Sequence, residues 1–309
     1  MVRIMKVGIR LPQTGKNAKL KNVIYLAEAA DSNGFDSLWV LERLLWPISP
    51  QTQYPSGNFP QDWQIVLEPL ELLSFVAAIT KKIYLGTSVI DMLFHNPVIL
   101  AKRFATLDVL SSGRALAGLG LGWSKDEFQA SNVPFEQKGR RADEFLQLLK
   151  SIWSDEITEF KGDFYTIPPS KIGPKPIQNP HPPVFLGGSS PNTFLRMARY
   201  ADGWIGVVHD NLEQLQDSLN MLKQKVNEAD RKPKDFEIIV ITYPNIVEHD
   251  TKKEKRRAFT GSMNQVGIDI ERLKKMGVGH IILNYNRSVI EDDMNAIIDM
   301  SKQLMSYAR

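Results

Sequence analysis

Short apolar runs alternate with amphipathic stretches along the whole of this 309-residue chain. The runs are bounded by glycine, proline or polar residues, and the stretches between them carry apolar residues at helical spacing. In the clearest stretch, apolar side chains recur at positions i, i+3, i+4 and i+7 from Phe145 to Ile152. The pattern predicts strands at 7–11, 35–41, 83–89, 114–121, 184–186, 204–208, 236–242 and 281–284, and helices at 20–32, 67–80, 97–110, 135–153, from 191 onward, 212–229, 262–276 and 289–305.

Eight consecutive strand–helix pairs without a change in composition predict a single (β/α)8 TIM barrel over residues 1–309 rather than two domains. A doubly wound sheet is the alternative. In a barrel, loops that follow strands form the functional face, and loops that follow helices form the opposite face. Insertions 42–66, after strand 2, and 243–261, after strand 7, are therefore expected on the functional face. The connection 154–182 follows a helix, so we expect a hairpin around 160–164 across the opposite face, with no catalytic role.

The composition excludes several classes of function. A hydrophobic content of 43% and a formal net charge of +3 are ordinary for a soluble globular protein, and they give no indication of nucleic-acid binding. The absence of cysteine excludes disulfides and thiolate sites. No histidine pair has metal-ligand spacing, and no apolar segment reaches the length of a membrane span. We therefore expect a cytoplasmic protein that acts on a small molecule, without a metal, a nucleic-acid partner or a membrane partner.

A Gly-Gly-Ser-Ser sequence separates the fifth strand from its helix. Gly187 and Gly188 free the backbone, Ser190 stands at the N-cap position, and Pro191 occupies the first helical position. Amide groups and hydroxyls at a helix N-terminus form a site suited to phosphate, and Ser189 belongs to it. The alternative is an ordinary capped turn.

The fourth strand ends in glycines at 118, 120 and 122, followed by Trp123. The spacing G-x-G-x-G differs from the G-x-G-x-x-G of dinucleotide-binding folds, so that interpretation fails. Two interpretations remain open: a ligand that approaches the backbone, or small residues that fill a narrow barrel interior.

Four segments, 34–40, 85–114, 118–153 and 173–204, together resemble the luciferase-like monooxygenase family, and within it the coenzyme F420-dependent oxidoreductases. The resemblance implies a (β/α)8 barrel that transfers a hydride between reduced F420, a deazaflavin, and a small organic substrate. Two alternatives are an FMN-dependent monooxygenase that uses O2 and a flavin- or deazaflavin-binding protein without turnover. Members of the family often dimerise, so the resemblance implies a homodimer as a candidate assembly.

The resemblance also assigns cofactor-binding positions. The loop 187–190 corresponds to the family's phosphate-binding loop. Thr87, Ser88 and Val89 correspond to a bulge behind the central ring of the cofactor, with a cis peptide expected between Ser88 and Val89. The strand end formed by Gly120, Leu121, Gly122 and Trp123 corresponds to the place where the cofactor approaches the backbone.

The chain departs from the family at the end of the second strand, where Glu42-Arg43 replaces the Asp-His of several members. Arginine does not release its proton near neutral pH, so Arg43 is expected to clamp an anion or orient the substrate. Glu42 is expected to hold the edge of the cofactor ring or its polyol, and His95 is a candidate proton donor.

Further functional-face residues are expected to line a substrate pocket: Trp46, His209 and Tyr285. The aromatic residues of the loop 42–66 either roof this pocket or pack on one another. The charge run 252–257 is either solvated surface or a mobile lid.

Overall fold

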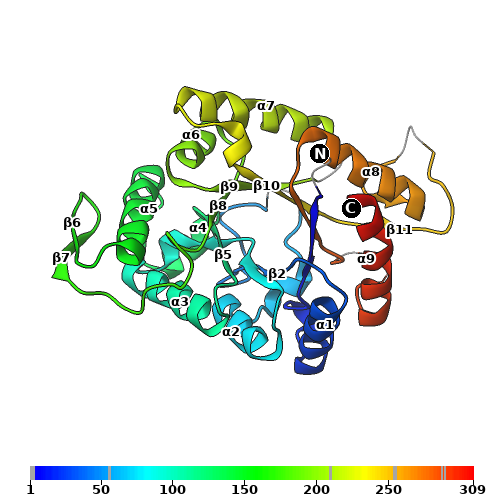
Figure 1. Cartoon of the computed structure of the whole chain (residues 1–309), viewed down its shortest axis with the longest axis horizontal. Helices are drawn as coiled ribbons and strands as arrows, with labels where there is room; N and C mark the ends of the chain where they lie inside the picture. The colour runs from blue at the N-terminus through cyan, green and yellow to red at the C-terminus, as the bar shows by residue number, and fades with distance from the viewer. Residues whose placement is uncertain (1–3, 55–56, 209–210, 253–255, 287, 289) are drawn as a thin grey trace.

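The computed structural model describes residues 4–54, 57–208, 211–252, 256–286, 288 and 290–309 (Figure 1). Within these residues, parallel strands close into a barrel, because each strand pairs with the next and β13 pairs with β1. Closure confirms the (β/α)8 barrel and excludes the doubly wound sheet, which has two free edges. The barrel strands in spatial order are β1 (Lys6–Arg10), β2 (Ser37–Val40), β3 (Tyr84–Thr87), β5 (Ala115–Gly120), β8 (Val184–Gly187), β9 (Gly203–Val207), β10 (Glu237–Thr242) and β13 (His280–Leu283).

Helices surround the barrel on the outside (Figure 1). Helix α3 begins at Pro97 because Asn96 caps it, with its side chain accepting hydrogen bonds from the amides of Val98 and Ile99. The outer helices are α1 (Leu20–Ser32), α2 (Pro69–Ile79), α3 (Pro97–Leu110), α5 (Lys138–Ser154), α6 (Pro191–Tyr200), α7 (Glu213–Glu228), α8 (Met263–Met276) and α9 (Met294–Ala308).

Smaller elements lie in the connections. The strand β4 (Ile90–Asp91) follows β3 after a break and pairs with β5. A short helix, α4 (Lys125–Ala130), precedes α5. The 3-10 turns are η1 (Gly15–Asn17), η2 (Gln61–Gln64), η3 (Met92–Phe94) and η4 (Pro233–Asp235), and β11 (Asn245–Ile246) pairs with β12 (Thr260–Gly261). Within the described residues, no helix has the length and apolar character needed to cross a membrane.

The barrel interior is packed rather than hollow at the amino ends of its strands. Trp39 lies there with no exposed surface. A Cβ atom added to Gly8 would lie 2.6 Å from Trp39 Nε1, and one added to Gly86 would lie 2.4 Å from the same ring. Two glycines therefore make room for the indole, which fills this part of the barrel interior.

The hairpin of β6 (Thr158–Lys161) and β7 (Thr166–Ser170) forms as expected, but its location was predicted wrongly. The amides of Asp163 and Phe164 in its turn each donate to the carboxylate of Glu144 at 2.9 Å, and Arg140 pairs with Asp163. These partners belong to the first turns of α5. The hairpin thus lies along α5 instead of across the opposite face, because Glu144 provides the acceptors that the turn amides require.

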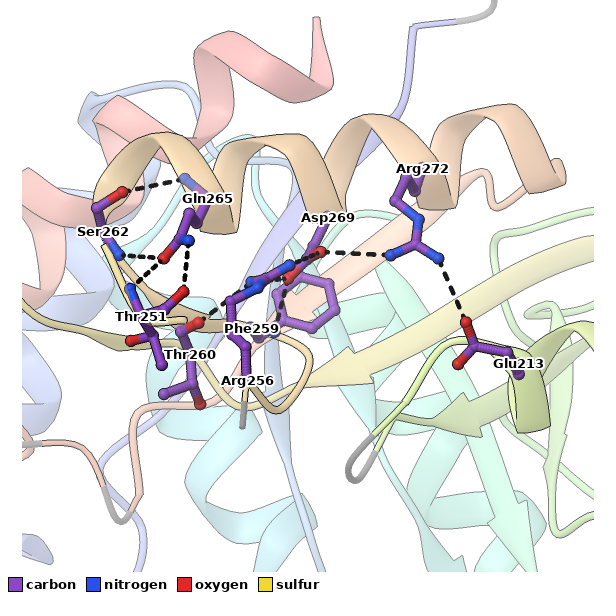
Figure 2. A network of polar contacts seen from close by, with 9 residues as sticks. All are labelled: Glu213, Thr251, Arg256, Phe259, Thr260, Ser262, Gln265, Asp269 and Arg272. Atoms are coloured by element: carbon purple, nitrogen blue, oxygen red, sulfur yellow. Dashed lines mark hydrogen bonds and ion pairs between the residues drawn. The ribbon is translucent and has the colours of Figure 1, made fainter. Parts of the chain in front are cut away.

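The insertion 243–261 is attached to α8 (Figure 2). The guanidinium of Arg256 donates to both oxygens of the buried Asp269, at 2.8 and 2.6 Å, and the amide of Phe259 donates to the same carboxylate at 2.8 Å. Gln265 accepts from the amide of Thr251 at 2.9 Å. Arg256 is therefore an anchor of this insertion. Residues 253–255 of the charge run lie outside the described residues.

Candidate active site

A cavity of about 750 Å³ opens where the carboxyl ends of the barrel strands meet the first turns of α5 and α6. Its inner end is apolar, since Ile205 and Ile241 belong to the barrel interior. Thr87 and Ser189 are not among its lining residues. The predicted cofactor-binding residues that do line it are Ser88, Val89, Gly120, Leu121, Gly122, Trp123, Gly187, Gly188 and Ser190.

The bulge after β3 has the predicted geometry, with a cis peptide between Ser88 and Val89. Thr87 is buried and fastens the bulge to β5: its hydroxyl donates to the carbonyl of Gly118 at 2.7 Å and accepts from the Gly118 amide at 3.0 Å. The amide of Ser88 donates to the carbonyl of Val40 at 2.6 Å. Held between β2 and β5, the bulge presents Val89 to the cavity.

The glycines of β5 have a packing role. A Cβ atom added to Gly118 would lie 1.7 Å from the carbonyl oxygen of Thr87, and one added to Gly120 would lie 2.7 Å from Val89 and 2.5 Å from Asp91. Real Cβ atoms do not approach other atoms so closely. The small residues of β5 therefore allow the bulge to pack on this strand, and they also leave Gly120 and Gly122 at the cavity wall.

The Gly187–Ser190 loop connects β8 to α6 in a conformation that needs glycine. Gly188 has φ +105°, outside the range that other residues readily adopt. Ser190 caps α6, with its hydroxyl accepting from the Thr193 amide at 3.2 Å. The carbonyl of Gly188 accepts from Trp204 Nε1 at 2.8 Å, whereas the amides of Gly188 and Ser189 have no acceptor among the described residues. Such amides at a helix N-terminus can bind an anion.

The outer part of the cavity favours negative charge. Asp143 pairs with Arg196 at 2.6 Å, whereas the exposed Arg199 forms no ion pair within the described chain. Lys138 donates to the carbonyl of Gly122 at 2.9 Å, and burial lowers its pKa. Among the described lining residues, cations outnumber carboxylates, with Lys138, Arg140, Arg196 and Arg199 against Asp91 and Asp143.

Glu42 and His95 lie together beside the cavity, but neither lines it. Oε1 of Glu42 is 2.7 Å from His95 Nε2, and Oε2 accepts from the amide of Asp91 at 2.9 Å. The Glu42 side chain is 2% exposed, so these bonds replace its hydration. The pair holds the backbone of β4 in position.

Arg43 contacts an acidic residue that the sequence did not indicate. Its Nη1 lies 3.0 Å from Oε2 of Glu127, which is fully buried, and burial raises the pKa of Glu127. The guanidinium also packs against the rings of Trp123, Trp63 and Phe59, with centroids at 4.8, 5.1 and 5.9 Å. Arg43 is therefore enclosed by aromatic rings and does not line the cavity.

The aromatic residues of the insertion 42–66 pack on one another, and none of them lines the cavity. Tyr54 packs on Trp63 at 5.1 Å and on Trp123 at 5.6 Å, so the loop packs on itself and also covers the outer side of a cavity-lining ring. Trp46 instead donates from Nε1 to the carbonyl of Pro60 at 3.2 Å and does not line the cavity.

Asp91 is a cavity-lining carboxyl group that was not predicted from the sequence. It ends β4, and its Oδ1 accepts from the Gly122 amide at 3.0 Å. Burial, together with the nearby charges of Glu42 and Glu127, raises the pKa of Asp91 to about 7. A carboxyl group with this pKa can hold or release a proton at neutral pH. Its position directly after the bulge was the one signal in the sequence.

Tyr285 does not line this cavity. It is buried, and its hydroxyl accepts from Ser301 Oγ on α9 at 2.9 Å. His209 lies outside the described residues.

Comparisons with known proteins agree with this architecture. Residues 5–302 match the family model described as luciferase-like monooxygenase. An uncharacterised protein of Mycobacterium tuberculosis strain H37Rv is 36% identical over 60% of this chain and 67% of its own length. The F420-dependent glucose-6-phosphate dehydrogenase of Amycolatopsis mediterranei is 29% identical over 74% of this chain and 65% of its own. The FMNH(2)-dependent dimethylsulfone monooxygenase of Pseudomonas putida is also 29% identical, over 65% of this chain and 52% of its own length.

Solved structures share the fold at low identity. The coenzyme F420-dependent tetrahydromethanopterin reductase of Methanopyrus kandleri has a TM-score of 0.76 at 18% identity, with 97% of each chain covered. The oxygenating constituent of 3,6-diketocamphane monooxygenase from Pseudomonas putida, in complex with FMN, also has a TM-score of 0.76. It is 16% identical, with 98% of this chain and 97% of that chain covered.

Proposed function

The chain belongs to the luciferase-like monooxygenase family, and we propose that it is an oxidoreductase that uses a reduced deazaflavin of the F420 type. The family has F420-dependent and FMN-dependent members. In our proposal the cofactor binds in the 750 Å³ cavity and exchanges a hydride with a small organic substrate.

The observation that carries the proposal is the meeting of two segments at one cavity. The Ser88–Val89 bulge and the Gly187–Ser190 loop are far apart in the sequence, yet both line it. The bulge offers an apolar side chain, Val89, against which a ring system can pack. The loop offers unpaired amides of Gly188 and Ser189, as a phosphate requires. The residues present therefore fit a phosphorylated flavin or deazaflavin.

The cations beyond the loop favour a deazaflavin with an anionic tail over FMN. Gly188 and Ser190 already account for one phosphate. Beyond them on α6, Arg196 is paired with Asp143, whereas Arg199 lines the cavity without an ion pair among the described residues. A ligand whose negative charge ended at its phosphate would make no ion pair with the exposed Arg199. Additional negative groups would satisfy this side chain.

Each part of the site has a separate role in this proposal. When bound, the cofactor supplies the hydride chemistry. Val89 would pack against its ring, and the amide of Gly188 would bind its phosphate. Asp91, with a pKa raised to about 7 by burial and by Glu42, holds the proton that accompanies hydride transfer. Trp123 and the rings packed on it keep water from this end of the cavity.

The alternative is an FMN-dependent monooxygenase, which the relationship to the dimethylsulfone monooxygenase favours. The two functions differ in their dependence on O2, because a deazaflavin lacks the ring nitrogen that makes oxygen chemistry easy.

The test is a pair of titrations of the purified protein, one with F420 and one with FMN, followed by turnover under air and under nitrogen. We expect the dissociation constant for F420 to be lower by about tenfold or more, since additional ion pairs form. Turnover is expected to be the same in both atmospheres. Preferential FMN binding with O2-dependent turnover would replace the proposal by its alternative.

A further inference from the structure

We propose that Arg10 binds the carboxylate of an organic substrate at the mouth of the barrel. This inference rests on the proposed function, because it assigns the substrate class of the same site. Arg10 was not among the residues that the sequence indicated.

Arg10 lies inside the barrel at its functional end. It is the last residue of β1, and Gly8, two positions earlier, faces the indole of Trp39 in the interior. Side chains of a strand alternate, so Arg10 points to the same side as Gly8 and one layer closer to the carboxyl ends. Its closest charged or titratable groups include Tyr243, which follows β10, and Tyr54 of the insertion 42–66.

Arg10 is not among the lining residues of the 750 Å³ cavity, but it lies across the barrel mouth from the cofactor loop. In the closed barrel, β8 is the fourth strand from β1 in either direction, through β2, β3 and β5 or through β13, β10 and β9. Arg10 at the end of β1 and Gly187 at the end of β8 therefore lie on opposite walls of the mouth. A cofactor that occupies the β3–β5–β8 side would face Arg10 across the substrate.

The guanidinium of Arg10 forms no ion pair within the described part of the chain. Its Nε and Nη2 are buried and have no hydrogen-bond acceptor in the described part of the chain. Burial lowers its pKa to about 10, and the groups that oppose this shift are the phenols of Tyr243 and Tyr54. A buried cation without a counterion is unfavourable, so a bound anion would stabilise it.

Two other buried arginines show how this fold satisfies a structural guanidinium. Arg114 donates from Nε to Ser111 O at 2.6 Å, from Nη1 to Ile83 O at 2.8 Å and from Nη2 to Ala77 O at 3.0 Å. Arg43 also has a buried Nε and Nη2 without an acceptor among the described residues, but the carboxylate of Glu127, 3.0 Å from its Nη1, balances its charge.

The unpaired edge of Arg10 has the geometry of a carboxylate site. The Nε–H and Nη2–H groups point in parallel from one edge of the guanidinium, and a carboxylate accepts both at once. Two phenols, those of Tyr243 and Tyr54, lie close enough to influence the charge of Arg10, so the proposal favours an aromatic acid over a small hydrophilic one.

The test compares benzoate with benzamide, its neutral analogue, by calorimetric titration of the full-length protein. The titration is run with and without saturating cofactor. We expect benzoate to bind about tenfold more tightly than benzamide, and Arg10→Gln to abolish that preference while the dissociation constant of the cofactor stays within about twofold. Equal affinities in the unaltered protein, no benzoate binding, or a preference that survives Arg10→Gln would each overturn the proposal.

Two further results distinguish a substrate site at Arg10 from a cofactor site. If Arg10→Gln weakens cofactor binding tenfold, the anion belongs to the cofactor and the substrate assignment is wrong. Failure of both cofactors to bind would contradict the proposed function, while the benzoate comparison on the cofactor-free protein would still test Arg10.

A stability measurement supplies an independent readout. Arg10→Met removes a buried cation without a counterion, so we expect the Tm of the ligand-free protein to rise by about 2–4 °C. Arg114→Met is the matched control and is expected to lower the Tm, because it leaves backbone carbonyls without donors. A decrease for Arg10→Met as large as that for Arg114→Met would mean that Arg10 is structural and would overturn the proposal.

Discussion

Gly187 lies against the side chain of Val89: a Cβ atom added to Gly187 would be 3.2 Å from Cγ1 of Val89. Strand β5 separates their strands in the barrel, and the contact is made across Gly120, where a Cβ would be 2.7 Å from the same valine. The bulge that follows β3 and the loop that follows β8 thereby form one continuous wall of the cavity. A ligand whose ring rests on Val89 has its polar end within reach of Gly188.

Substitution of Gly188 tests the anion site. Gly188→Val places a branched side chain at φ +105°, where an added Cβ would already be 3.3 Å from Thr193. We expect the loop to shift and the dissociation constant of the cofactor to rise by at least about tenfold. The matched control is Gly277→Val, at φ +93° with open space around it, which is remote from the cavity. It is expected to lower the Tm but leave cofactor affinity unchanged, and equal effects of the two variants on affinity would contradict the assignment.

Ionisation of Asp91 should destabilise the protein as the pH rises. Its pKa is raised from an ordinary 3.8 to about 7 by burial, so between these values the folded protein holds a proton that the unfolded chain has released. This contribution to stability is fully present below about pH 4 and is lost as the pH approaches 7. From pH 5 to pH 8, the unaltered protein should therefore lose on the order of 2–4 kcal/mol of unfolding free energy that Asp91→Asn does not lose. Urea unfolding of both proteins at pH 5 and pH 8 measures this difference. The same change in unfolding free energy in both proteins would refute the shifted pKa.

Ionisation of Glu237, at the other end of the barrel, should instead stabilise the protein as the pH rises. Burial alone would raise its pKa, but the Lys6 ammonium at 2.9 Å and the His280 ring at 3.8 Å outweigh burial and lower the pKa to about 2. The stabilisation is present above the ordinary value of 4.5 and is lost as the pH falls toward 2. Glu237→Gln is expected to cost about 1–3 kcal/mol at pH 7 and little at pH 2. Guanidinium unfolding measures this loss of unfolding free energy. A loss that is the same at pH 2 and pH 7 would contradict the lowered pKa of Glu237.

Arg43 and Glu127 should depend on one another. Arg43→Met leaves the carboxylate of Glu127 buried without a cation, and we expect a loss of about 3–5 kcal/mol of unfolding free energy. Adding Glu127→Gln removes the unpaired charge and should recover part of this loss. A double-mutant cycle by chemical denaturation measures the coupling. Simple additivity of the two losses would show that the ion pair has no structural role.

The attachment of the insertion 243–261 should control its exposure to protease. Asp269→Asn weakens both hydrogen bonds from Arg256 and the bond from the Phe259 amide. We expect faster tryptic cleavage within 252–257, where the sequence provides lysines and arginines. The control is Asp299→Asn, on the exterior of α9, and an unchanged cleavage rate in Asp269→Asn would indicate that other contacts hold the segment.

The regular elements were the most predictable part of this chain. Helices α1 and α3 have the predicted bounds, because the apolar residues of α1 recur at helical spacing and Asn96 and Pro97 mark the start of α3. The predicted helix 135–153 begins later, at Lys138, because Gln137 adopts φ +55° and is not helical. The short helix α4 that precedes it was not predicted. Local spacing does not reveal such a left-handed residue when it is not glycine.

The parts of the site that depend on backbone conformation were predictable from the sequence. The side chains that complete the site were much less predictable. The glycine loop and the bulge are local patterns, so the sequence indicated both. Asp91 was missed because the bulge sets the direction of its side chain, and Glu127 was missed because its partner is distant in sequence. Tyr285 could have been placed correctly: Ile282 faces the barrel interior, so alternation directs Tyr285 outward.

The most direct test of the central claim is to compare F420 with the deazaflavin riboside that lacks the phosphate and the tail, in the unaltered protein and in Gly188→Val. If the loop 187–190 binds phosphate, the unaltered protein should bind F420 more tightly by about tenfold or more, and Gly188→Val should erase most of that difference. Equal binding of the two compounds by the unaltered protein, or a difference that Gly188→Val leaves intact, would contradict the claim.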